Sequence, residues 1–237
     1  MKIYDCFMYY DEDLIIDLRF NILNKYITEF IIVESKFTHS GEKRELLFDI
    51  NKYSKFKKKI NYIVLENEPE NLETINDKDT PDKKNSKYIM NALKRENFQR
   101  NAITKGLKEV NPDDLILISD VDEIPDLSNL NLESVNDEII LFKQNFYYYK
   151  FNLKLEDLPW LGTKACKYKI LKSPQWLRNV KDKKYPFWRL DVLFSNKKYS
   201  NIKFIENGGW HFSNMKSPAD IEKKMKTYLH HREYDIN

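Results

Sequence analysis

Three carboxylate side chains lie within four residues near the middle of the chain. Asp120, Asp122 and Glu123 follow an uninterrupted aliphatic run at 115–118, which itself follows a turn signal at 111–114. Such a run is typical of a strand buried on both faces. Open α/β sheets bind ligands at the carboxyl ends of their strands, and oxygen donors suit Mg²⁺ or Mn²⁺. The pattern therefore predicts a cation site, with a solvated acidic turn as the alternative for a motif this short.

Three other side chains have chemistry that suits the same site. Glu34 ends a second aliphatic run at 30–33, where a carboxylate can accept hydrogen bonds from a ribose or a base. Arg100 lies in the segment before the acidic strand, and its guanidinium can pair with phosphate. His211 follows two glycines, and imidazole can ligate Mn²⁺ beside carboxylates. A loop acid, a surface arginine and a structural histidine are the plainer interpretations of these residues.

The surrounding hydrophobic pattern predicts the elements that position these groups. A strand at 3–9, a helix at 14–23 with Asp13 as its N-cap, and a strand at 30–33 have the size of a βαβ unit. Further strands are expected at 60–65 and 139–142, and a short helix or extended segment at 46–53. An apolar stripe predicts a helix over 88–110 that leads into the acidic strand. The fold class is therefore α/β.

The remaining segments give weaker signals. Residues 66–87 are polar and contain two prolines, which favours a surface insertion, with a lid as the alternative. Glycines predict tight loops that place an indole at 159–162 and 208–213. Ser217, Pro218 and Asp220 form a helix-start signature for a helix that runs to residue 228.

Composition limits the function classes. The 237 residues include 41% hydrophobic and 14% aromatic residues, enough for a substantial core. No apolar run reaches the roughly 18 residues of a membrane span, and no signal peptide is visible. Forty basic and 37 acidic residues nearly cancel, which argues against a nucleic-acid partner. Cys6 and Cys166 lack metal-site spacing, so we expect reduced thiols and a cytoplasmic protein. The common kinase, dehydrogenase and hydrolase motifs are absent.

Four separated blocks of the sequence carry a family resemblance. They lie at 13–20, 30–41, 111–125 and 209–213, and they occur in the expected order. On these blocks the chain resembles glycosyltransferase family 17, which includes the enzymes that add the bisecting N-acetylglucosamine to N-glycans. Residues 66–87 and 126–205 match more loosely.

The resemblance implies a GT-A fold, which is a Rossmann-like nucleotide-sugar transferase fold with a mixed central sheet flanked by helices. It implies a single domain over 1–237, with a nucleotide-binding half at about 1–125 and an acceptor and metal-loop half at about 126–237. The implied enzyme is an inverting glycosyltransferase that needs Mn²⁺ or Mg²⁺ and a UDP-sugar donor. UDP-N-acetylglucosamine is the donor that the family suggests.

The resemblance also gives roles to single residues. Glu34 would face the nucleoside, and Arg100 with Asn101 would lie near the donor. Asp120 would reach the ribose or the sugar, while Asp122 would bind the metal together with His211. Asp120 is a further candidate metal ligand, and the role of Glu123 stays open.

An inverting transfer also needs a carboxylate that takes a proton from the acceptor hydroxyl. Glu206 and Asp220 are the candidates, with Asp191 in reserve. The acceptor expected is a glycan or a lipid-linked saccharide precursor. For the protein itself we expect no transmembrane segment, and peripheral membrane association is left open. Two alternatives remain: a non-catalytic sugar- or nucleotide-binding protein of the same fold, and a metal-dependent phosphoesterase, which normally needs more ligands.

Overall fold

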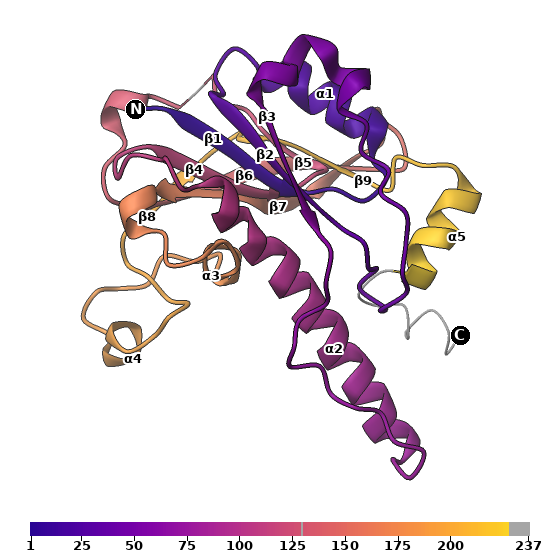
Figure 1. Cartoon of the computed structure of the whole chain (residues 1–237). Coiled ribbons are helices and arrows are strands. Elements are labelled where there is room, and N and C mark those ends of the chain that lie inside the picture. Colours follow the sequence, from indigo (N-terminus) through magenta and orange to yellow (C-terminus); the bar gives the residue numbers. More distant parts are fainter. Residues whose placement is uncertain (129, 228–237) are drawn as a thin grey trace.

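A computed structural model describes residues 1–128 and 130–227, and the strands of that part form one mixed sheet flanked by helices (Figure 1). The sheet order is β3-β2-β1-β4-β7-β6-β9-β5, and β8 pairs with β6. This arrangement confirms the predicted mixed α/β class. The strands are β1 Ile3–Met8, β2 Glu29–Ser35, β3 Ile60–Leu65, β4 Leu115–Asp120, β5 Glu123–Pro125, β6 Ile139–Tyr148, β7 Lys154–Lys167, β8 Ile202–Ile205 and β9 Gly209–Ser213.

The helices lie on both faces of this sheet. The α-helices are α1 Asp13–Leu23, α2 Pro81–Asn101, α3 Pro174–Asn179, α4 Leu190–Leu193 and α5 Pro218–Thr227, and the 3₁₀ segments are η1 Ile50–Lys59, η2 Ala102–Gly106, η3 Leu132–Ser134 and η4 Tyr168–Ile170. Figure 1 shows α1 on one face of the sheet, with α2 and α3 on the other.

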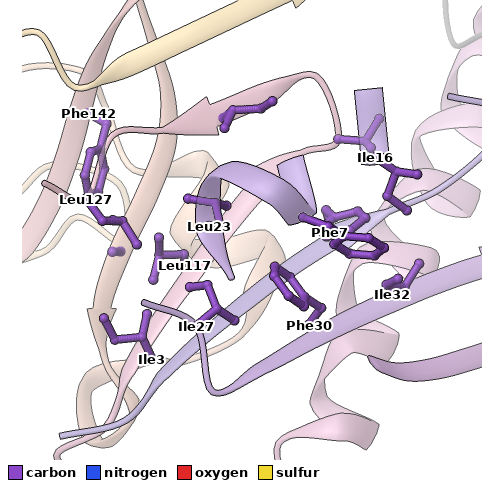
Figure 2. Close-up of a cluster of buried hydrophobic side chains, with 14 of the residues drawn as sticks. Ile3, Phe7, Ile16, Leu23, Ile27, Phe30, Ile32, Leu117, Leu127 and Phe142 are labelled. Carbon is purple, nitrogen blue, oxygen red and sulfur yellow. The ribbon is translucent and has the colours of Figure 1, made fainter. Parts of the chain in front are cut away.

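Strands β1 to β4 are parallel, so their carboxyl ends meet at one edge of the sheet. The aliphatic runs at 30–33 and 115–118 are buried because alternate side chains enter two hydrophobic clusters, whereas the edge strand β3 is half-buried up to Leu65. Phe30 and Ile32 pack on the α1 side, which Figure 2 shows, whereas Ile31 and Val33 pack on the opposite side with Ile103 of η2. The strands predicted at 3–9, 30–33, 60–65 and 115–118 are confirmed.

The ends of the first two helices differ from the prediction. Glu12 occupies the cap position of α1, and no side chain caps the helix, so the N-cap predicted at Asp13 is wrong. The Asp13 carboxylate instead accepts hydrogen bonds from Tyr9 Oη and Lys52 Nζ, both at 2.6 Å. The segment at 46–53, predicted as a short helix or an extended segment, is divided: residues 46–49 have no regular secondary structure, and η1 begins at residue 50.

Helix α2 begins seven residues earlier than predicted and ends nine residues earlier. Thr80 caps it, and Pro81 opens it, so the second part of the predicted insertion at 66–87 is helical. The first turns of α2 are largely exposed, which explains why they lack an apolar stripe. The segment before α2 is tied to it, since the Asn91 side chain bonds both the N–H and the carbonyl of Glu73 at 2.7 and 2.9 Å.

The second half contains long strands where the sequence predicted loops. Residues 159–162 lie inside β7, and 209–213 form β9, so both predicted tight loops are wrong in these parts. Gly162 is needed for close approach, because a Cβ there would lie 2.1 Å from Gln144 Oε1. Gly209 has a φ of 123°. The predicted helix start is confirmed by α5, although residue 228 lies outside the described residues.

Strands from both predicted halves join one sheet, because β4 pairs with β7. The division near residue 125 stays a prediction. Both Cys6 and Cys166 are buried free thiols. Across the described ranges, no helix has the length and apolarity needed to cross a membrane.

Candidate active site

The acidic turn lies where β4 ends, at the carboxyl edge of the parallel strands. Strand β9 reaches the same place, because Glu123 pairs with His211 in the β5–β9 ladder. The Phe212 N–H also donates to the Asp122 carbonyl at 2.9 Å. The sheet therefore brings His211 to the acidic turn, across a sequence separation of about 90 residues.

The side chain of Arg19, in α1, hydrogen-bonds to the backbone carbonyls of this turn. Its Nη1 donates to the carbonyls of Asp120, Val121 and Glu123 at 3.3, 3.1 and 2.7 Å. Its Nε and Nη2 form a two-point pair with the Asp5 carboxylate at 2.7 and 2.6 Å, and both side chains are fully buried. Because these carbonyls have a fixed internal donor, the turn is held in one conformation.

Two arginines enclose the carboxylates of Asp120 and Glu123, and we call these four residues the arginine cage. Arg100 Nη2 lies 3.0 Å from Asp120 Oδ1, and Arg178 Nη2 lies 3.0 Å from Asp120 Oδ2. Arg178 also forms a two-point pair with Glu123 at 2.8 and 3.1 Å. Burial disfavours the charge on Asp120, but Arg178 and Arg100 outweigh it and hold the Asp120 pKa well below its usual range.

The cage is positioned by the junction between α2 and α3. Asn101 accepts a hydrogen bond from the Gln175 N–H at 3.0 Å, and Arg100 donates to Gln175 Oε1 at 2.6 Å. These bonds tie the start of α3 to the end of α2, which places Arg178 over the turn. The structure thus gives Asn101 a positioning contact, and its predicted place near the donor stays a prediction.

Asp122 and His211 form a second pair at the acidic turn, next to the arginine cage. Nε2 of His211 lies 3.5 Å from Asp122 Oδ2, and their side chains are 9% and 17% exposed. The imidazole packs against the rings of Phe146 and Trp160, at centroid distances of 4.6 and 4.7 Å, and these two rings also contact each other. Burial lowers the pKa of His211, but the Asp122 carboxylate outweighs it and raises the pKa above its usual value.

This pair has the chemistry of a site for Mg²⁺ or Mn²⁺. Two ligands that are each about 2.1 Å from an ion lie at most about 4.2 Å apart, so an oxygen of Asp122 and a nitrogen of His211 can reach one cation. A cation of this kind usually completes its shell with waters and substrate phosphates. His211 Nδ1 is buried and has no hydrogen-bond partner in the part of the chain described. The donor set thus fits the predicted metal.

The pair is not extended to a larger cluster. In residues 1–128 and 130–227, no group of three His, Cys, Asp or Glu side chains is placed to hold a metal ion. Asp120 contacts the two arginines instead, so the metal contact predicted for it stays a prediction. With its side chain 39% exposed, Asp120 still has an open side for a ligand.

Glu34 is enclosed by the fold. Its fully buried carboxylate accepts hydrogen bonds from the N–H groups of Leu47 and Phe48 at 2.8 and 3.1 Å and from Tyr62 Oη at 2.6 Å. Arg44 Nη2 lies 3.0 Å from the same carboxylate. In this structure Glu34 fixes the chain at 44–48, and its contact with a nucleoside stays a prediction.

The three candidates for the proton acceptor lie in other surroundings. Glu206 is 68% exposed and pairs with Lys143 at 2.5 Å, and Asp220 accepts from Ser217 Oγ at 2.6 Å. Asp191 pairs with Arg189 and Lys198, and these bonds lower its pKa to about 2. A carboxylate with so low a pKa is a weak proton acceptor. Among the described contacts, none of the three is hydrogen-bonded or ion-paired to Asp122 or His211.

Sequence reasoning missed the roles of Arg19, Arg178 and Trp160. Trp160 Nε1 donates to Glu123 Oε1 at 2.8 Å, in addition to the two nitrogens of Arg178 and the Asp120 backbone N–H at 2.9 Å. Arg19 had a usable signal, since it lies among the apolar positions of α1, where a buried charge needs a partner. Arg178 and Trp160 had no such signal, because their partners are set by the β6–β7 pairing and by α3.

The fold is a mixed α/β sheet that brings the acidic turn and His211 together at the carboxyl edge of its parallel strands. Comparison with protein families matches residues 1–235 to glycosyltransferase family 17, and the chain belongs to this family. It is therefore a glycosyltransferase, and an N-acetylglucosaminyltransferase activity fits the family. No curated protein matches the chain significantly.

Proposed function

We propose that this enzyme transfers N-acetylglucosamine from UDP-N-acetylglucosamine, with inversion and with the help of Mn²⁺ or Mg²⁺. The acceptor is a glycan or a lipid-linked saccharide precursor, and the sheet is that of a GT-A fold. The observation that supports the proposal is the Asp122–His211 pair at the carboxyl edge of β4, in a chain of this family.

Charge within the turn separates the roles of its carboxylates. Arg100 and Arg178 neutralise Asp120 and Glu123, whereas Asp122 has no arginine partner among the described residues. Asp122 and His211 would hold the cation, which when bound supplies Lewis-acid stabilisation of charge on the leaving diphosphate. The donor diphosphate would therefore lie beside this pair.

Other residues of the turn would orient the donor. The Asp120 carboxylate is partly exposed and held in its charged form, so it can accept hydrogen bonds from ribose or sugar hydroxyls. Arg19 fixes the backbone that carries both aspartates, which keeps their spacing constant. The rings of Phe146 and Trp160 shield His211 from water and hold its plane.

The proton acceptor for the acceptor hydroxyl remains Glu206 or Asp220 in this proposal, with Asp191 the weakest of the three because of its low pKa. Substituting each with the matching amide separates them. The residue that takes the proton is the one whose substitution lowers turnover while the affinity for the donor stays unchanged.

A donor screen tests the proposed function. The enzyme is incubated with UDP-, GDP- and CMP-sugars and Mn²⁺, with saccharide acceptors, and nucleotide release is measured. We expect release with UDP-N-acetylglucosamine that excess chelator abolishes and that Mn²⁺ restores. Full activity in excess chelator, or turnover of another nucleotide sugar alone, would contradict the proposal. Phosphate release without an acceptor would indicate a phosphoesterase instead.

A further inference from the structure

The segment around α4 carries the most exposed large hydrophobic side chains of the described residues. We call residues 181–199 the α4 loop. Phe194 is 88% exposed, Phe187 and Leu190 are each 72% exposed, and Trp188 is 71% exposed, whereas the next value is 59% at Leu14. Exposed apolar groups gathered in this way mark an interaction surface rather than ordinary surface variation.

The two ends of the α4 loop are hydrogen-bonded to each other, and a further bond ties the loop to α3. The Lys181 N–H donates to the Lys197 carbonyl at 2.7 Å, and the Tyr185 N–H donates to the Tyr199 carbonyl at 3.0 Å. The Trp176 indole N–H also donates to the Asn196 carbonyl at 2.9 Å. Figure 1 shows α4 projecting from the sheet beside α3, on the side away from α1. The apolar side chains are thus presented on a fixed stem.

Basic side chains surround this apolar tip. The α4 loop has two acidic residues and six basic residues, which are Lys181, Lys183, Lys184, Arg189, Lys197 and Lys198. Both acids are neutralised, since Asp191 pairs with Arg189 and Lys198, and Asp182 pairs with Lys164 at 2.7 Å. The side chains of the lysines at 181, 183, 184 and 197 are exposed. The surface therefore combines a net positive charge with aromatic and aliphatic groups.

We propose that the α4 loop docks this enzyme on an anionic lipid surface. Aromatic side chains favour the boundary between water and lipid, and each nearby lysine is attracted to anionic headgroups. A protein partner is the poorer match, because protein–protein interfaces are depleted in lysine relative to the rest of the protein surface. The proposal goes beyond glycosyl transfer and does not depend on the donor, although it would bring the enzyme to lipid-linked acceptors.

Vesicle flotation tests the proposal with the full chain. We expect the enzyme to float with vesicles of phosphatidylcholine mixed with phosphatidylglycerol, to float weakly with phosphatidylcholine alone, and to be released by salt. Phe187→Ser with Trp188→Ser should abolish flotation. Lys183→Gln and Lys184→Gln should each weaken binding roughly fivefold.

A matched control is available in the β6–β7 turn. Phe151 and Leu153 are 46% and 48% exposed and lie outside the α4 loop, so Phe151→Ser with Leu153→Ser should leave flotation unchanged. Thermal unfolding of every variant checks that the fold is intact. Failure of the wild type to float with anionic vesicles, or an equal loss in the control, would overturn the proposal.

Fluorescence distinguishes lipid contact from self-association. Vesicles of brominated phosphatidylcholine and phosphatidylglycerol should quench tryptophan emission, and Trp188→Phe should remove most of that quenching. Sedimentation equilibrium without lipid should show no association that depends on Phe187 and Trp188. Self-association through these residues, without quenching by the brominated vesicles, would assign the surface to a second copy of the chain and overturn the proposal.

Discussion

The three carboxylates of the acidic turn have two different kinds of partner. Asp120 and Glu123 are ion-paired with Arg100 and Arg178 in the arginine cage. Asp122 instead contacts His211 at 3.5 Å, and the rings of Phe146 and Trp160 pack against that imidazole. Three carboxylates within four residues repel one another, and the fold pairs two of them with arginines and the third with His211, where we propose that a cation binds.

We infer from this difference that the arginine cage positions the turn, whereas Asp122 and His211 take part in the proposed reaction. Removing one partner from a buried ion pair leaves an uncompensated charge, so substitutions in the cage should act mainly on stability. Substitutions at the Asp122–His211 pair should act mainly on turnover, because that pair has few structural partners. The predictions below test this separation, from the largest expected effect to the smallest.

The largest effect should come from the residue that supports the backbone of the turn. Arg19→Met leaves Asp5 buried without its partner and removes the donor to three turn carbonyls. We expect a loss of about 3–5 kcal/mol in the free energy of unfolding, measured by urea denaturation. Arg189→Met, in an exposed pair, is the control and should change little. A loss no larger than that of the control would contradict the role of Arg19.

Asp122→Asn should separate activity from stability. The amide keeps the size of the side chain but loses the charge that would hold a cation, so turnover should fall by roughly 10²–10³-fold. The unfolding midpoint should stay near that of the wild type, since no arginine depends on Asp122 in the described part of the chain. Asp17→Asn, on the exposed face of α1, serves as the control for turnover. An unfolding loss as large as that of Arg19→Met would instead place Asp122 among the structural carboxylates.

Arg178→Gln should open the cage. Glu123 is fully buried and would lose its two-point partner, so we expect a loss of about 3 kcal/mol in the free energy of unfolding. Adding Glu123→Gln should restore part of that loss, because a neutral amide needs no counter-charge. Denaturation of both single variants and the double variant gives the coupling energy. Simple additivity of the two single losses would show that the pair does not interact.

Trp160→Phe should have the smallest effect. It keeps a ring beside His211 but removes the indole N–H that donates to Glu123, which costs about 1.5 kcal/mol for a hydrogen bond to a charged group. Turnover should change far less than in Asp122→Asn. As the control, Trp188→Phe at an exposed position should leave the unfolding midpoint unchanged. An equal shift of the midpoint in both variants would show that the Trp160–Glu123 hydrogen bond does not account for the loss of stability.

Much of the parallel half of the sheet could be predicted from the sequence. The runs at 30–33 and 115–118 are continuous and aliphatic because β2 and β4 are covered on both faces, and such runs are readable without tertiary information. The edge strand at 60–65 contains Asn61 and Tyr62 and is half-buried. The meeting of the carboxyl ends of these strands follows from parallel pairing. For this reason the sequence predicts a ligand site at the edge of the sheet that carries the acidic turn.

The second half was harder to predict for physical reasons. Strand β7 spans fourteen residues; its first part is exposed, and its buried part at 162–166 includes Gly162, Thr163 and Lys164 rather than an aliphatic run. Gly162 is required by the closeness of Gln144, a contact that only the folded sheet creates, and the glycine therefore resembled a turn signal. Arg178 is likewise placed by α3 and its ties to Asn101. Local sequence does not encode such partners, because their contacts are tertiary.

The most direct test of the central claim is calorimetry of UDP binding with and without Mn²⁺. In the wild type, Mn²⁺ should strengthen UDP binding, because Asp122 and His211 would hold the cation against the diphosphate. In Asp122→Asn, UDP should bind with the same weak affinity whether or not Mn²⁺ is present. An undiminished Mn²⁺ effect in Asp122→Asn would contradict the assignment of this pair as the metal site.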